Sequence, residues 1–335
     1  MPEPDIGVPR PFAGQGKRIY MQDVAPRDGL QIEAAFVPTE GKIALIDALS
    51  RCGLAKIEAT SFVSPAAIPV LRDAEAVMKG ITRAPGVVYT VLVPNARGAE
   101  RALACRADEF NLVMSASESH NLANLRMTRE QSFRQLAEVA RMGRAAGVAV
   151  NASLSCSFGC PMEGDLPAQA VLDWCARLLD TGATGVSLCD TTGMAHPAQV
   201  HALVAAFRAR FPRAEVTLHF HNTRGMGLGN ALASIAAGAD RFDASLGGLG
   251  GCPYAPGASG NVCTEDLVHA LSLMGYDTGV DLERLLACSR MLPPLIGHEV
   301  PGQVAKAGRR LDLHPVPQDF ESIRERALAR ECGPS

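Results

Sequence analysis

The stretch IYMQDVAPRDGLQIEAAFVPTEGKIALIDALSRCG, residues 19–53, decides the fold, because it joins one strand pattern to one helix pattern. Residues 19–25 are mostly apolar and predict a β-strand. Residues 39–53 predict an amphipathic helix, with Thr39 as its N-cap and Gly53 as its stop. The apolar face of this helix consists of Ile43, Leu45, Ile46 and Leu49.

The same strand–helix unit recurs along the whole chain. Seven further strand candidates are KIEATS (56–61), VVYTVLV (87–93), EFNLVMS (109–115), VAVNASLSC (148–156), GVSLCD (185–190), EVTLHFH (215–221) and RFDASLG (241–247). Helical patterns separate them. Eight such units in sequence predict a parallel sheet closed into a (β/α)8 TIM barrel. A doubly wound open sheet is the alternative, but no GxGxxG motif follows the first strand.

The domain organisation follows from the length and from an even composition. The 335 residues suffice for one complete barrel, and we find no linker-like shift of composition. We expect a flexible N-terminal tail over 1–17 and a single barrel domain over 18–335. The residues from about 277 onward add helices without strands, which predicts a C-terminal helical extension.

Charge and hydropathy argue against several classes of partner. The net charge is −3, with 32 basic and 35 acidic residues well mixed, so neither a nucleic acid nor a membrane is expected as partner. No apolar run approaches the roughly 18 residues of a membrane span. The N-terminal residues lack the basic start and apolar core of a secretory signal. Ten cysteines without a CxxC pair predict a cytoplasmic protein with reduced thiols.

Polar residues stand where the predicted strands end. They are Arg27 and Asp28, Glu58 and Ser61, Asp190, His219 and His221, and Cys252 and Asn261. In a TIM barrel the carboxyl ends of the strands form the active site. Polar groups placed there are costly unless they bind a ligand or a metal ion.

The segment His219-Phe220-His221 has the spacing of a metal clamp. Residues i and i+2 of a strand share a face, so both imidazoles point into the barrel while Phe220 points outward. Two hydrogen-bonded core histidines are the alternative. Asp28 and Asn261 could add oxygen ligands, and such a mixed set suits Mg²⁺ or Mn²⁺. The set contains no thiolate, which argues against structural zinc.

The chain resembles the 3-hydroxy-3-methylglutaryl-CoA lyase family of the DRE-TIM metallolyase superfamily. The resemblance covers roughly residues 19 to 290, and RDGLQ followed by the glycine loop is its most specific part. The matching stretches are APRDGLQ (25–31), VPTEGKIALID (37–47), IEATSFVSP (57–65), LSCSFGCP (154–161), HFH (219–221), GLGGCPYAPGASGN (248–261) and TEDLV (264–268).

The resemblance implies a role for each site residue. It implies a divalent cation held by Asp28, His219, His221 and Asn261. It implies Cys252 as the catalytic thiol, Arg27 as the group that steadies the thioester enolate, and Glu58, Asp190 and Glu265 as supporting acids. We also expect the substrate to contact Arg27, Gln31, Ser61 and Arg224.

The implied reaction is a retro-Claisen cleavage of a 3-hydroxyacyl-CoA to acetyl-CoA and a keto product. The implied enzyme is a homo-oligomer, a dimer or a tetramer, and leucine degradation is its implied pathway. The proton of the tertiary alcohol needs a base, which is either His219 or Asp190. Cys252 is suited to protonate the carbanion because a mobile glycine loop could deliver it after CoA binds.

The chain also departs from the family pattern. HNTRG (221–225) stands where HDTYG is usual, Ile32 replaces an asparagine, and GHE (297–299) replaces a CoA-binding pair. Residues 119–121 are polar where a plainer loop is expected. We therefore hypothesise a shifted acyl substrate such as citramalyl-CoA. Arg224 would bind its terminal carboxylate, unless it is a solvated loop arginine.

Two rival functions remain at this point. A Claisen-condensing synthase of 2-oxo acids and acetyl-CoA would share the RDG and HxH motifs. The thiol loop and the lack of a regulatory C-terminal domain argue against it. A barrel retained as a binding scaffold would have lost part of the constellation, yet every ligand and the thiol are present.

Overall fold

The computed structural model describes residues 12–251 and 260–331, and its centre is a closed barrel of eight parallel strands in sequential order. The strands are β1 (Tyr20–Asp23), β2 (Lys56–Ser61), β3 (Val88–Leu92), β4 (Glu109–Ser115), β5 (Ala149–Ser155), β6 (Gly185–Asp190), β7 (Glu215–Phe220) and β8 (Arg241–Ala244). β1 pairs with both β2 and β8, which closes the sheet. The predicted TIM barrel and all eight strand positions are thereby confirmed.

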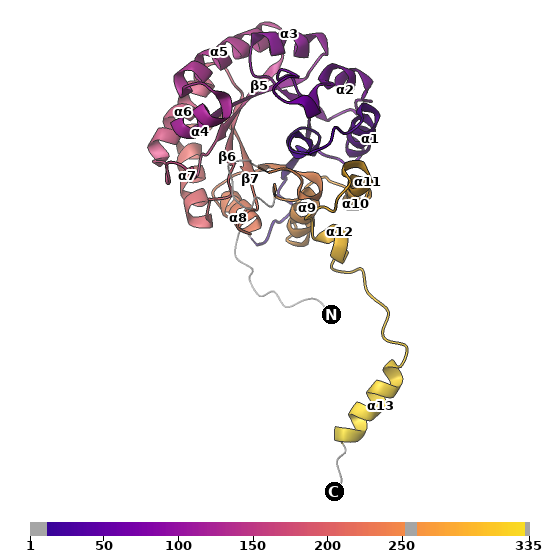
Figure 1. The fold of residues 1–335 in the computed structure, drawn as a ribbon. Helices are drawn as coiled ribbons and strands as arrows, with labels where there is room; N and C mark the ends of the chain where they lie inside the picture. The colour runs from indigo at the N-terminus through magenta and orange to yellow at the C-terminus, as the bar shows by residue number, and fades with distance from the viewer. Residues whose placement is uncertain (1–11, 252–259, 332–335) are drawn as a thin grey trace.

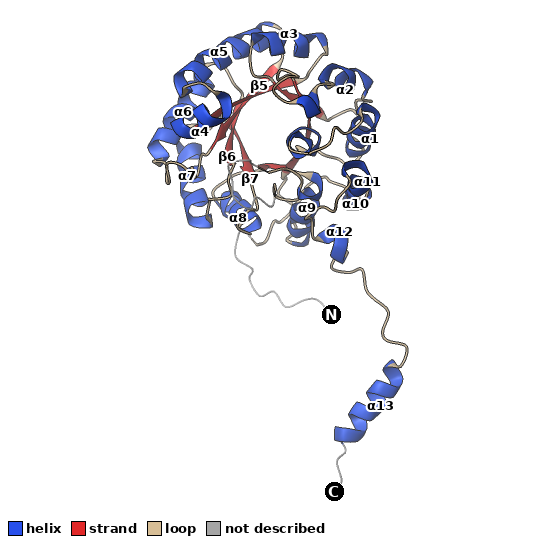
Figure 2. Cartoon of the chain, in the orientation of Figure 1, coloured by secondary structure: helices blue, strands red, loops and turns tan. Residues whose placement is uncertain are grey.

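Helices surround the strands, as Figure 2 shows. The helices of the barrel wall are α1 (Thr39–Leu49), α2 (Ala74–Gly80), α3 (Ala96–Ala104), α4 (Glu118–Leu125), α5 (Arg129–Ala145), α6 (Ala168–Asp180), α7 (Pro197–Arg210) and α8 (Gly227–Ala236). The C-terminal helices are α9 (Thr264–Leu273), α10 (Leu282–Ser289), α11 (Leu292–Ile296), α12 (Val304–Ala307) and α13 (Phe320–Glu331). None of the described helices is long and apolar enough to cross a membrane.

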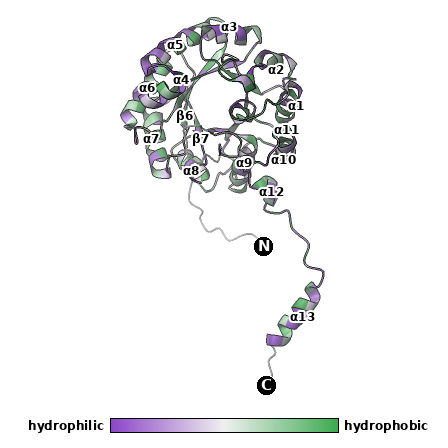
Figure 3. Cartoon of the chain, viewed as in Figure 1, coloured by the Kyte–Doolittle hydropathy of each residue, from purple (hydrophilic) through white to green (hydrophobic). Residues whose placement is uncertain are grey.

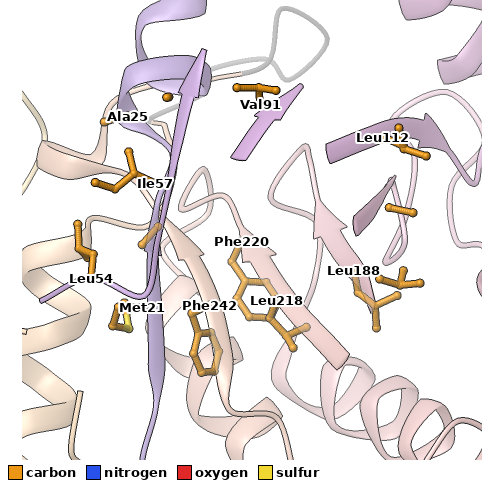
Figure 4. Packing of buried hydrophobic residues seen from close by; sticks show 14 of the residues in the cluster. Met21, Ala25, Leu54, Ile57, Val91, Leu112, Leu188, Leu218, Phe220 and Phe242 are labelled. Atoms are coloured by element: carbon orange, nitrogen blue, oxygen red, sulfur yellow. The ribbon is translucent and has the colours of Figure 1, made fainter. Parts of the chain in front are cut away.

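Strand β7 illustrates how alternation builds the core and the site together. Leu218 and Phe220 are buried in the apolar core between strands and helices, where Figure 4 shows them beside Phe242. The alternate residues point into the barrel, as shown by the hydrogen bond that Thr217 accepts from Gln22 of β1. The predicted outward direction of Phe220 is therefore confirmed.

The first helix begins differently from the prediction. Thr39 is the first residue of α1 rather than its N-cap, and Pro38 occupies the capping position without a side-chain bond. The Thr39 hydroxyl instead donates to the Asp73 carboxylate at 2.8 Å, the same group that binds Lys42. This charge-assisted hydrogen bond holds the Thr39 side chain against Asp73, and the capping position falls on Pro38.

Two further local differences concern the top of the barrel. Residues 119–121, expected in a loop, belong to α4, which Ser117 caps by accepting from the amide of His120. Strand β8 ends at Ala244 and continues into a 3₁₀ turn, Leu246–Gly248, in which Gly247 has φ +66°. That backbone region suits glycine, and it lets the chain leave the strand early.

The C-terminal part divides into packed helices and one protruding helix. Leu292 and Val300 are buried against the barrel, whereas none of the side chains of α13 is buried. Figure 1 shows α13 well away from the barrel, at the end of an extended segment. Figure 3 shows that its hydrophobic and hydrophilic residues are mixed along its length. The boundaries predicted at 17 and 277 stay predictions.

Candidate active site

Asp28 and Arg27 lie in a π-helical turn, Ala25–Gly29, directly after β1. The Arg27 side chain is largely buried and donates to two carboxylates. Its Nη1 donates to Asp28 Oδ1 at 2.6 Å, and its Nε donates to Glu58 Oε2 at 2.5 Å. Glu58 is the third residue of β2, so the turn after β1 and the neighbouring strand bring these three charges together.

The two histidines face each other, as their spacing predicted. His219 is on β7 and His221 is just beyond it, and their Nε2 atoms are 3.2 Å apart. The Nδ1 atom of His219 lies 3.5 Å from Asp243 Oδ2, which favours Nε2 as the free ring nitrogen. Ligand atoms of Asp28, His219 and His221 all lie within 4.8 Å of one another.

Asn261 reaches this cluster because residues 260–264 insert between the ends of β7 and β8. The segment forms isolated bridges with His221 and Ser245. The Asn261 Nδ2 atom donates to Asp28 Oδ2 and to the Leu249 carbonyl, both at 2.9 Å. Its Oδ1 atom is buried and has no hydrogen-bond partner among the described residues. An unpaired buried carbonyl oxygen is costly unless a ligand completes it.

The electrostatics of the cluster suit a divalent cation. Burial alone would raise the pKa of Asp28, but Arg27 and the two histidines lower it to about 2, so the carboxylate is ionised. Burial and the neighbouring His219 lower the pKa of His221 to about 4, which leaves its ring neutral. A carboxylate, two imidazoles and an amide oxygen form a donor set for a hard or borderline cation.

His219 differs from its partner. Burial disfavours its charged form, but the bond to Asp243 and the charge of Asp28 outweigh burial and raise the pKa of His219. The sequence reading missed Asp243. Its signal was present in RFDA (241–244), where Arg241 and Asp243 alternate with the buried Phe242 and Ala244.

A cavity of about 770 Å³ opens from this cluster. Its polar side includes Arg27, Asp28, Gln31, His219, His221 and Asp243. Its apolar side includes Ile32, Val63, Ile68, Val70, Leu125 and Met127. The Oε1 atom of Gln31 is buried there without a partner within the described part of the chain, so it is available to a ligand. The cavity is large enough for an extended ligand that is polar at one end.

The other predicted site residues lie at different distances from the cavity. Ser61 is buried, and its hydroxyl accepts from the amide of Val63. Arg224 is exposed and does not line the cavity; its Nη1 donates to the carbonyls of Thr192 and Gly193. Cys252 lies outside the described residues.

The two remaining predicted acids, Asp190 and Glu265, accept hydrogen bonds from backbone amides. Asp190 Oδ1 accepts from the amides of Met194 and Ala195, and its Oδ2 is buried without a partner among the described residues. Burial raises the pKa of Asp190 to about 6. Glu265 accepts from the amide of Gly247 with both oxygens, so it fixes the turn from which the glycine loop starts.

Comparison with known proteins relates this site to characterised ones. The HMGL-like family model matches residues 18–292. Hydroxymethylglutaryl-CoA lyase YngG of Bacillus subtilis is 46% identical over 287 residues, which cover 86% of this chain and 96% of that protein. The mitochondrial hydroxymethylglutaryl-CoA lyase of Gallus gallus is 41% identical over 295 residues, covering 88% of this chain and 99% of that protein.

A solved structure is similar as well. The HMG-CoA lyase of Acinetobacter baumannii, in complex with coenzyme A and 3-methylmalate, is 51% identical with a TM-score of 0.86. The match covers 90% of this chain and 98% of that one. The residues that the family model matches, 18–292, include all eight strands together with Asp28, His219, His221 and Asn261.

Proposed function

The chain belongs to the HMGL-like family, and on that premise we propose that it is a carbon–carbon lyase that cleaves 3-hydroxy-3-methylglutaryl-CoA to acetyl-CoA and acetoacetate. The observation that supports this most is the buried cluster of Asp28, His219, His221 and Asn261 at the cavity, with Arg27 beside it. A cation site next to a fixed guanidinium suits a reaction that passes through an enolate.

We propose that these four residues hold Mg²⁺ or Mn²⁺. Their donor atoms fit such an ion, and the unpaired Oδ1 of Asn261 is the observation that favours it. When bound, the cation supplies Lewis acidity that lowers the pKa of a contacting alcohol. Two of the four ligands are held together without the cation, because Asn261 donates a hydrogen bond to Asp28.

The remaining chemistry falls to side chains of this chain. The proton of the 3-hydroxyl passes to a base, the C2–C3 bond breaks, and its electron pair remains on C2 as the enolate of acetyl-CoA. The keto product is acetoacetate. Arg27 is held by Glu58 and Asp28, so its guanidinium is positioned beforehand to stabilise the enolate oxygen.

Two residues are candidates for the base. His219 lines the cavity, but its Nδ1 faces Asp243, and its Nε2 belongs to the metal cluster. Asp190 has a buried free oxygen and a pKa of about 6, but it is not among the residues that line the cavity. With Nε2 given to the cation and Nδ1 to Asp243, His219 can act only through its pair with Asp243. We therefore propose that the base is either this His219–Asp243 pair or Asp190, whose free oxygen would be reached through a water molecule.

Cys252 is the proposed acid that protonates the C2 carbanion. Gly250 and Gly260, which flank its segment, both have positive φ and lie beside Asn261. The described residues on either side of the segment that contains Cys252 therefore lie beside the cluster. Cys252→Ala should lower kcat by orders of magnitude while CoA affinity is retained.

The direct test is a cleavage assay on the purified protein with 3-hydroxy-3-methylglutaryl-CoA. We expect acetyl-CoA and acetoacetate in equal amounts, activity with added Mg²⁺ or Mn²⁺, and none after EDTA treatment. A second arm with acetyl-CoA and 2-oxo acids tests condensation through thiol release. Release of free CoA in that arm without cleavage in the first would replace the lyase by a synthase.

The acyl specificity is a finer proposal. Ile32 and the apolar side of the cavity favour tolerance toward 3-hydroxyacyl-CoA thioesters other than the methylglutaryl one. Arg224 as a carboxylate ligand would have to leave the carbonyls that it binds here. A panel with citramalyl-CoA and longer thioesters measures this. A far higher kcat/KM for the methylglutaryl thioester would exclude a shifted substrate.

The cellular setting is a separate proposal. Eight cysteines among the described residues are free and buried, which supports a reducing, cytoplasmic compartment. We also propose a homo-oligomer and a role in leucine degradation, as the family resemblance implies. Analytical ultracentrifugation of the full chain measures the first of these two.

A further inference from the structure

We propose that Asn111 is a positioning residue, which fixes Glu58 and through it Arg27, the group assigned to the enolate. The inference rests on the proposed lyase function. Asn111 is on β4 and is buried in the barrel interior. Two strands, β2 and β3, lie between β4 and β1, the strand that Arg27 follows. It belongs to neither the metal cluster nor the thiol loop.

A continuous row of hydrogen bonds connects Asn111 to Arg27. The Asn111 Nδ2 atom donates to Glu58 Oε1 at 2.8 Å, while Arg27 Nε donates to Glu58 Oε2. Both oxygens of the carboxylate are therefore occupied. On the other side, Ser153 Oγ donates to Asn111 Oδ1 at 2.8 Å and Asn151 Nδ2 donates to it at 3.2 Å.

The direction of every bond in this row is determined. An ionised carboxylate only accepts hydrogen bonds, so Asn111 must turn its amide nitrogen toward Glu58. Its oxygen must then face Ser153 and Asn151, and both must donate. Asn151 Nδ2 also donates to Ser187 Oγ at 3.0 Å, which fixes that amide as well. The amide of Asn111 consequently has one allowed orientation.

This orientation matters because Glu58 is a buried acid. Burial raises the pKa of Glu58, while the charge of Arg27 and the bond from Asn111 oppose the rise. Without the Asn111 donor, one carboxylate oxygen would be buried and unpaired. Glu58 could then rotate or take up a proton, and Arg27 would lose its fixed position.

The test compares Asn111→Leu, which keeps the size of the side chain and removes the donor, with Asn111→Asp, which keeps the shape and places a second carboxyl group beside Glu58. We expect kcat for 3-hydroxy-3-methylglutaryl-CoA to fall about 10- to 100-fold, with KM changed less than about threefold, because Arg27 acts mainly on the transition state. Ser153→Ala removes only one of two donors to Asn111, so its kcat should fall at most about threefold.

Thr217→Val is the matched control. It also removes a hydrogen bond in the barrel interior, the one from Gln22, but this pair has no bond to Arg27 or Glu58. We expect a similar loss of melting temperature to that of the Asn111 variants, with kcat within about twofold of wild type. If Thr217→Val and Asn111→Asp lost kcat equally, a general loss of packing in the barrel interior would explain both losses. That result would overturn the proposal.

A crystal structure of Asn111→Asp gives a readout independent of turnover. The proposal expects a broken or shifted Arg27–Glu58 pair; an unchanged pair together with wild-type kcat would overturn it. If Asn111→Leu does not fold, Asn111→Asp and Ser153→Ala still supply the graded comparison. A wild-type protein that cleaves no acyl-CoA would refute the proposed function, and the crystal structure would still test the positioning role.

Discussion

Asp190, the last residue of β6, has its two carboxylate oxygens in different environments. In the structure one oxygen binds the backbone of the following loop and the other is buried. A carboxyl group in this position binds its proton more tightly than an exposed one, since burial raises its pKa to about 6.

This raised pKa predicts a pH-dependent cost of folding. The folded pKa lies above the unfolded value of 3.8, so the folded state binds more protons between pH 4 and 6. The contribution of Asp190 to the free energy of unfolding is fully present below pH 4 and is lost as pH rises through 6. Asp190→Asn does not titrate, and its stability relative to wild type should improve by about 1 kcal/mol between pH 5 and pH 8.

Urea unfolding of both proteins at the two pH values measures the difference. A stability difference that does not change with pH would contradict the assigned pKa. The same variant separates the two candidate bases. If His219 is the base, Asp190→Asn should keep kcat within about tenfold, and a loss of several orders of magnitude would assign the base to Asp190.

At the residue scale, site residues that belong to a motif could be predicted from the sequence. Site residues whose role depends on packing against another strand were missed. The HxH pair and Asp28 were predictable because strand alternation and strand ends determine where such side chains point. Asp243 and Asn111 were not identified. Neither belongs to a recognisable motif, and the role of each depends on its partner on another strand, which is His219 of β7 for Asp243 and Glu58 of β2 for Asn111.

At the scale of elements, the described ends of the glycine segment after β8 pack closely around Asn261. Gly250 has φ +102°, and a Cβ atom there would lie 2.5 Å from Asn261 Nδ2. Asn261 is the residue that this segment brings to Asp28. The need for glycine is therefore steric as well as conformational.

Gly250→Ala should displace Asn261 and weaken the cation site. We expect at least a tenfold loss of Mn²⁺ affinity and a stability loss of about 1–3 kcal/mol from backbone strain and overlap. Isothermal titration with Mn²⁺ and urea unfolding measure the two effects.

Gly86→Ala is the matched control, because Gly86 has φ +82° but no heavy atom within 4 Å of the added Cβ. It should lose about 1 kcal/mol of stability and keep its Mn²⁺ affinity. Equal Mn²⁺ affinities in the two variants would show that Asn261 is not a ligand, or that the loop adjusts around the methyl group.

Element prediction failed where local chemistry competed with the hydrophobic pattern. The helix α4 was missed because it is short and polar, and its beginning depends on a cap by Ser117. The start of α1 was misassigned because the Thr39 hydroxyl binds Asp73, 34 residues away in sequence. By contrast, α5 is long and amphipathic, and Thr128 begins it with a complete capping box.

At the scale of the whole molecule, the closed barrel was predictable because eight repeated units leave few topologies. The C-terminal extension was predictable only as helical. Its two parts differ in a way that composition does not reveal. Leu292 and Val300 lie against Gly247, in the turn that precedes the glycine loop, whereas α13 contacts none of the buried core.

This difference predicts contrasting effects of two truncations. Removal of residues 309–335 deletes α13 and an exposed connection in which Leu313 is 86% exposed. Almost no apolar surface is uncovered, so Tm should change by less than about 1 °C and kcat/KM should be unchanged. Removal of residues 292–335 also deletes Leu292 and Val300, each worth about 1.5–3 kcal/mol of burial.

The longer truncation should therefore lower Tm by several degrees and also reduce kcat, because the turn at Gly247 loses its support on one side. Differential scanning calorimetry and the cleavage assay on both proteins measure this. The shorter truncation could also cause a large loss of Tm or change the number of chains per oligomer. Either result would show that α13 packs on another copy of the chain. Equal behaviour of the two truncated proteins would mean that Glu265, which binds the amide of Gly247 from α9, holds the turn without help.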